Sequence, residues 1–89
     1  MTIAERIKQK LTEALSPSFL EVVDESEKHK GHGGYREGGE THFHVTVVSP
    51  QFEGKSRVDR QRMVYGLLAQ EMAERVHALA LTTKAPSEA

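Results

Sequence analysis

The chain of 89 residues has the length of one small domain, and its 12 Lys and Arg against 13 Asp and Glu give a net charge of −1. This balance argues against general electrostatic capture by nucleic acid or an anionic membrane, although a local basic patch is compatible with it. The absence of cysteine excludes a disulfide framework and an all-thiolate metal site, and with no apolar run of roughly 18 residues and no apolar leader we expect a cytoplasmic protein outside any membrane.

The first predicted element is a helix over residues 2–15. Thr2 and Glu5 form a capping box, in which each side chain satisfies a backbone N–H group at the helix start. Aliphatic side chains then recur at every fourth position and define one face: Ile3, Ile7, Leu11 and Leu15. Pro17 ends the helix, because proline disfavours a helical conformation in the residue before it. Residues 19–24 (FLEVVD) are rich in β-branched and aromatic side chains and predict a strand.

Residues 25–40 predict a loop, since five of the sixteen are glycine and almost none are apolar. A hairpin needs far fewer residues, so we expect a long, mobile segment with a function of its own. The next strand covers residues 41–49, where apolar side chains alternate with polar ones. This alternation predicts one buried and one exposed face, with His42 and His44 on the exposed face.

A second capping box, Ser56 with Asp59, starts a helical pattern that continues to Glu74. The pattern predicts one long helix, with a break near Asp59 as the alternative. Residues 76–83 then predict the last strand. We therefore expect a single domain over residues 1–84, followed by a flexible C-terminal tail over residues 85–89.

The predicted order of elements is α-β-β-α-β, which belongs to the α+β class. The first two strands can pair as an antiparallel hairpin. The second and third strands are joined through a helix, so they should be parallel, with a right-handed crossover. We therefore expect a three-stranded mixed sheet with both helices on one face and the other face open.

Histidine is the main chemical signal, with five in a chain that has no cysteine. His29 and His32 stand in an H-x-x-H arrangement within the glycine-rich loop, where a flexible backbone lets imidazole reach a metal ion. His77 lies at the start of the last strand. From spacing alone, the simpler interpretation is that the loop histidines are solvated and that His77 is structural.

Four segments together resemble the BolA family of small proteins: DES at 24–26, GETHF at 39–43, FEG at 52–54 with RQRMVY at 60–65, and VHALAL at 76–81. The resemblance covers nearly the whole chain. It implies an α-β-β-α-β fold similar to a type II KH domain, with a short extra helical turn before the second helix.

The resemblance also implies a function. It indicates a non-enzymatic adaptor that forms a heterodimer with a monothiol glutaredoxin, shares a 2Fe-2S cluster with it and with glutathione, and acts in iron–sulfur cluster assembly, trafficking or iron-responsive regulation. Some bacterial members are described as DNA-binding transcriptional regulators, so DNA is the alternative partner. The chain shows no convincing nucleophile, paired-carboxylate or phosphate-loop motif, and we do not expect an enzyme.

Within the resemblance, His77 and one loop histidine are the expected ligands of one iron, while partner thiolates hold the other. The loop is longer than the family pattern and carries both His29 and His32. His32 is favoured because it lies among glycines, but the choice between the two stays open. Because two imidazoles cannot hold both irons, the isolated chain is expected to carry no cofactor. It is also expected to be a monomer when isolated.

Four cations, Lys55, Arg57, Arg60 and Arg62, lie within eight residues at the start of the second helix. The helix dipole disfavours positive charge at this end, which favours an anionic partner: nucleic acid, or the acidic groups of a glutaredoxin–glutathione unit. The alternative is an ordinary solvated surface balanced by nearby carboxylates.

Overall fold

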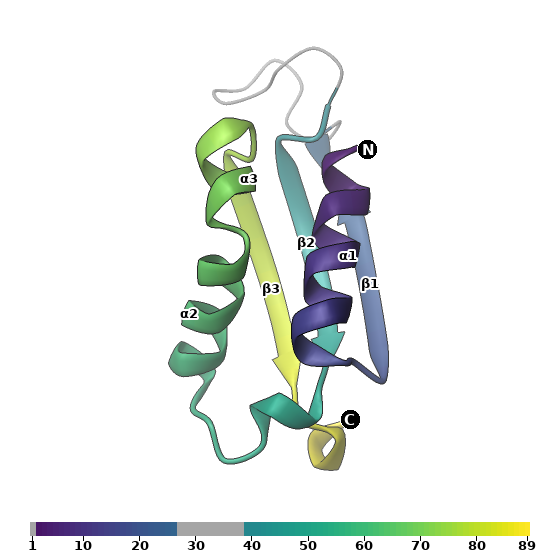
Figure 1. The fold of residues 1–89 in the computed structure, drawn as a ribbon, viewed down its shortest axis with the longest axis vertical. Helices are drawn as coiled ribbons and strands as arrows, with labels where there is room; N and C mark the ends of the chain where they lie inside the picture. The colour runs from purple at the N-terminus through teal and green to yellow at the C-terminus, as the bar shows by residue number, and fades with distance from the viewer. Residues whose placement is uncertain (1, 27–38) are drawn as a thin grey trace.

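A computed structural model of the protein describes residues 2–26 and 39–89. Its elements are α1 (Ile3–Leu15), β1 (Phe19–Asp24), β2 (His42–Val48), the 3-10 turn η2 (Pro50–Phe52), α2 (Arg57–Leu67), α3 (Ala69–Glu74), β3 (Ala78–Lys84) and the 3-10 turn η3 (Pro86–Glu88) (Figure 1). The predicted α-β-β-α-β order is confirmed, together with the extra turn before the second helix. Across the described residues, none of the helices has the length and apolar character needed to cross a membrane.

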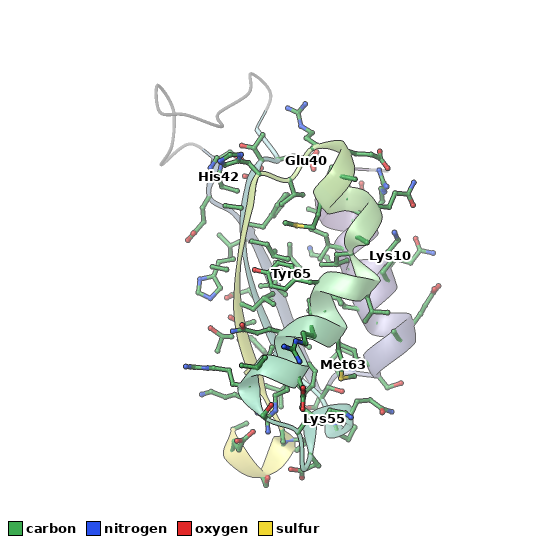
Figure 2. All side chains as sticks on the ribbon, turned by 90° about the vertical axis from the view of Figure 1, so that its left-hand side faces the viewer. Lys10, Glu40, His42, Lys55, Met63 and Tyr65 are labelled. Carbon is green, nitrogen blue, oxygen red and sulfur yellow. The ribbon has the colours of Figure 1, made fainter. Side chains whose placement is uncertain are left out.

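The sheet has the strand order β1-β2-β3, with β1 antiparallel to β2 and β2 parallel to β3. Its register places Phe19 opposite Val48 and His42 opposite Ala78. All three helices lie on one side of the sheet, which Figure 2 shows edge-on. The mixed sheet with one covered and one open face is therefore as predicted.

The core lies between the sheet and the helices. The predicted face of α1 is buried, as are the alternating apolar residues Phe43, Val45 and Val47 of β2. The capping box of α1 is formed, with the Glu5 N–H donating to Thr2 Oγ1 at 3.1 Å. On the other edge, the Tyr65 hydroxyl of α2 donates to the Leu79 carbonyl of β3 at 2.7 Å, which ties this helix to the sheet.

The helical segment predicted to continue to Glu74 is interrupted at Leu68, and not near Asp59. Leu68, with φ −104° and ψ 16°, separates α2 from α3, whereas the chain around Asp59 is regular helix. The Leu68 side chain is fully buried, while Val58, which matches the helical pattern, is 54% exposed. The break near Asp59 is thus wrong: the helix is interrupted at Leu68, whose side chain packs in the core.

A buried ion cluster joins α1 to α3. The Glu71 side chain is fully buried and lies 2.8 Å from Lys10 Nζ and 2.7 Å from Arg6 Nη2. Arg6 also pairs with Glu74 at 2.9 Å. Burial raises the pKa of Glu71, but the hydrogen bonds from Lys10 and the nearby positive charges outweigh it and hold the pKa below the ordinary 4.5.

Residues 85–89, predicted as a flexible tail, form the turn η3 and contact the domain. Ala85 is fully buried within the core. Arg60 Nη1 lies 2.6 Å from Glu88 Oε1 and donates to the Thr83 carbonyl at 3.3 Å. The chain end therefore packs against the start of α2.

Candidate functional site

His77 lies one residue before β3, at the end of the sheet where β1 ends and β2 begins. Its backbone N–H donates to the Thr41 carbonyl at 2.7 Å, and the N–H of Ala78 shares that acceptor at 3.1 Å. The His77 side chain is exposed. The backbone hydrogen bonds thus hold His77 beside the start of β2, and its imidazole is accessible. His29 and His32 lie outside the described residues, so their assignment stays a prediction.

The burial of His42 differs from the prediction. It lies on the helix-free face of the sheet, as its parity requires, but it is only 4% exposed. Its ring centroid is 5.3 Å from that of His77, with the planes inclined by 52°. The expectation of an exposed side chain is wrong because residues before β3 cover this end of β2. His44 is half-buried, and its Nε2 lies 3.1 Å from Thr82 Oγ1 on the neighbouring strand.

A group of hydrogen bonds, here called the clasp (Asp24, Ser26, Glu40 and Thr41), joins the two ends of the segment 27–38. Asp24 Oδ1 accepts the Ser26 N–H at 2.9 Å and its hydroxyl at 2.5 Å, while Oδ2 accepts the Glu40 N–H at 3.0 Å. Ser26 Oγ in turn accepts the N–H of Thr41 at 2.9 Å. The clasp therefore holds the end of β1 against the start of β2, where the His42 N–H also donates to Ser26 Oγ at 3.2 Å.

The clasp keeps Asp24 ionised. Partial burial raises the pKa of this carboxyl, but the hydrogen bonds from Ser26 and from the Glu40 N–H outweigh that effect. The pKa of Asp24 is consequently held below its ordinary value of 3.8. At neutral pH Asp24 is then a carboxylate, which only accepts hydrogen bonds.

A turn at Gly39 and Glu40, both with positive φ, is held by contacts from α1 and from the end of α3. Gly39 has φ 74° and Glu40 has φ 61°. Arg75, at the end of α3, donates from Nε and Nη2 to the Gly39 carbonyl at 2.9 and 2.6 Å. Glu40 Oε2 accepts the N–H of Ala4 in the first turn of α1 at 3.2 Å. Spacing in the sequence carries no signal for the roles of Glu40 and Arg75.

The basic cluster is divided by the fold. Lys55, Arg57 and Arg62 are exposed, with the Arg62 side chain 78% accessible. Arg60 is buried, and its guanidinium pairs with Glu88 and lies 5.8 Å from the centre of the Phe52 ring. The expectation that Arg60 belongs to the exposed basic cluster is wrong, because its side chain packs beneath the helix. Figure 2 shows Lys55 at the opposite end of the molecule from His42, so the two candidate surfaces are separate.

Within residues 2–26 and 39–89, no three His, Asp or Glu side chains come together in an arrangement that could hold a metal ion. The histidine end of the sheet offers the exposed imidazole of His77 and the buried imidazole of His42. Imidazole suits iron as a ligand. Within the described residues, this end of the sheet therefore offers imidazole donors but not a complete set of metal ligands.

The profile of BolA-like proteins matches residues 11–88. This chain belongs to the BolA family. It is 49% identical over 83 residues to the DNA-binding transcriptional regulator BolA of Escherichia coli K12, covering 93% of this chain and 75% of that protein. It is also 45% identical over 87 residues to SufE-like protein 1 of Arabidopsis thaliana, spanning 93% of this chain but 24% of that longer protein.

The solved structures agree with this assignment. The BolA domain of SufE1 from Arabidopsis thaliana superposes with a TM-score of 0.89 at 42% identity, covering 100% of this chain and 98% of that domain. The fold and family predicted from the sequence are therefore confirmed. This BolA-like protein also shares its described fold with a domain that stands within a larger protein.

Proposed function

We propose that this BolA-like protein is a non-enzymatic adaptor for a monothiol glutaredoxin and that it ligates one iron of a 2Fe-2S cluster shared with that partner and glutathione. Its role would lie in assembly or trafficking of such clusters, or in iron-responsive regulation. The observation that carries the proposal is His77, whose side chain is exposed and whose backbone N–H donates to the Thr41 carbonyl, beside the two ends of the segment that contains His29 and His32.

The chemistry of the chain supports a shared rather than a private cluster. Iron–sulfur clusters take thiolate or imidazole ligands, and this chain has no cysteine to supply a thiolate. His77 and one histidine of the segment 27–38 would hold one iron, and thiolates of the partner would hold the other. Imidazole ligation of one iron raises the reduction potential above that of an all-thiolate cluster.

Coexpression tests the proposal. The chain is produced with the monothiol glutaredoxin of its host and, separately, without it, and each product is examined by visible absorption and circular dichroism. We expect a coloured heterodimer whose spectrum differs from that of the glutaredoxin cluster by itself, and a colourless isolated chain. A stable brown protein purified without any partner would contradict the proposal.

DNA binding is the second candidate function. The Escherichia coli relative is called a DNA-binding transcriptional regulator, and Lys55, Arg57 and Arg62 form an exposed basic surface at the start of α2. The net charge of −1 weighs against DNA binding as the main activity. The separation of this surface from His77 would allow one protein to carry both functions.

Salt dependence measures the contribution of this surface. If Arg57 and Arg62 each contact a phosphate, replacing both by alanine is expected to reduce the log–log salt slope of DNA affinity by about 2, since each contact contributes roughly 0.9. Lys8→Ala, at an exposed position of α1, is the matched control and should leave the slope unchanged. DNA affinity that does not vary with salt, or that is equal in the double variant, would contradict this role.

A further inference from the structure

The turn η3 at the chain end covers one cation of the basic cluster. Arg60 Nη1 donates to Glu88 Oε1 at 2.6 Å and to the Thr83 carbonyl at 3.3 Å. The Arg60 side chain is 10% exposed, whereas that of Arg62 in the same helix is 78% exposed. Figure 2 shows the C-terminal turn and Lys55 at the same end of the molecule. Glu88 therefore neutralises a cation that lies beside the exposed basic surface.

The pair with Glu88 leaves the Arg60 guanidinium incompletely satisfied. Its Nε atom is buried and has no hydrogen-bond partner in the described structure. A buried donor without an acceptor costs free energy, so such groups are rare in folded proteins. A guanidinium can bind two oxygens of a phosphate side by side, whereas here the single oxygen Glu88 Oε1 contacts Nη1. A phosphate is therefore a better match to this side chain than the carboxylate that covers it.

The turn is attached to the domain by few contacts. Ala85 is fully buried in the core, while residues 86–89 are exposed. Two side-chain contacts join these exposed residues to the rest of the described structure: the pair of Glu88 with Arg60, and the Ser87 hydroxyl, which donates to Glu53 Oε1 at 2.8 Å. Exposed contacts of this kind contribute little to stability, and chain ends held by them open readily. The turn can thus leave Arg60 while Ala85 stays in place.

We propose that Arg60 is a covered phosphate-binding residue, that Glu88 occupies its anion site in the free protein, and that a phosphate of the DNA backbone displaces this carboxylate. The inference rests on DNA binding, the second candidate function. Duplex DNA suits the site because its phosphates can contact the exposed Arg57 and Arg62 at the same time. When the guanidinium turns outward to the phosphate, Nε also leaves the buried position in which it has no partner.

Glu88 has the charge that such a competitor needs. The Ala85 N–H and the Arg60 side chain hold the pKa of Glu88 below its ordinary value of 4.5. At neutral pH this side chain is therefore a carboxylate that competes with DNA for Arg60.

Glu88→Gln tests the competition, because it removes the charge but keeps an oxygen that can accept the Ala85 N–H. The probe is a short DNA duplex of mixed sequence at low salt, and fluorescence anisotropy measures the affinity. We expect the affinity to rise about fivefold, which corresponds to the loss of one exposed ion pair that competes with binding. Glu21→Gln, at an exposed position of β1, removes the same charge and is the control that should leave the affinity unchanged.

A double-mutant cycle shows whether the gain comes from Arg60. Arg60→Met keeps an apolar side chain near Phe52 and removes the charge, and circular dichroism checks that the variant folds. In the Arg60→Met background, Glu88→Gln should give no gain in affinity. A fivefold gain in that background would overturn the proposal, because it would reflect the net charge and not the release of Arg60.

Nuclear magnetic resonance of the arginine side chains gives a second readout. The Nε–H signal of Arg60 should shift on addition of the duplex, and it should shift at lower DNA concentration in Glu88→Gln than in the wild-type chain. An Arg60 signal that stays unchanged while DNA is bound, or equal affinities of the wild type and Glu88→Gln, would overturn the inference and leave DNA binding by the exposed cations intact. If neither protein binds the duplex, DNA binding itself fails, and the inference fails with it.

Discussion

Replacing His77 by alanine is expected to abolish the cluster spectrum of the complex with a monothiol glutaredoxin. The side chain is exposed, and its backbone is held by hydrogen bonds to Thr41, so the substitution removes the proposed ligand while the backbone contacts are retained. The ring contact with His42 is lost as well. Visible absorption and iron content of the copurified complex measure the loss. His44→Ala is the control, because this histidine contacts Thr82 on the open sheet face and should leave the spectrum unchanged.

The same measurement distinguishes the two histidines of the segment 27–38. We expect His29→Ala or His32→Ala to weaken the cluster only in part, with the larger effect at His32, because two imidazoles three residues apart can substitute for each other on a glycine-rich segment. The double variant should behave like His77→Ala. A wild-type spectrum in the double variant would show that this segment supplies no ligand.

Glu71→Ala is expected to lower the free energy of unfolding by about 3 kcal/mol, because the Glu71 side chain is fully buried between Arg6 and Lys10. Removing one partner of a buried ion pair typically costs ~3–5 kcal/mol, and the lower end applies because Arg6 and Lys10 keep partial access to water. Urea unfolding followed by circular dichroism measures the change. A loss below about 1 kcal/mol would contradict a structural role for this cluster.

The sign of the pH dependence follows from the lowered pKa of Glu71. A carboxylate with a lowered folded-state pKa stabilises the fold above its ordinary value of 4.5, and this contribution is lost as the pH falls through the folded-state pKa. Glu71→Gln should therefore make the acid loss of stability shallower below pH 4.5. Glu21→Gln, at an exposed position of β1, changes the net charge equally and is the control.

The local patterns of the sequence determined the elements and the family. The fourfold repeat of apolar residues from Ile3 to Leu15 matches α1 residue by residue, and the alternation around Val45 matches the two faces of β2. The order of strands and helices then restricts the sheet to the observed pairing, since consecutive strands joined by a loop can pair antiparallel and strands joined through a helix pair parallel. The resemblance to the family, and not the residue types alone, marked His77 as a ligand candidate.

Only the tertiary structure decided how individual polar side chains are used. Periodicity reports the face of an element on which a residue lies, but it does not identify the neighbours that the fold brings from elsewhere in the chain. His42 is buried because the residue before β3 covers it, and Arg60 is buried because Glu88 pairs with it. Glu71 meets a charge 61 positions away. Such contacts depend on the packing of α1, α3 and the chain end around one sheet, which no local pattern encodes.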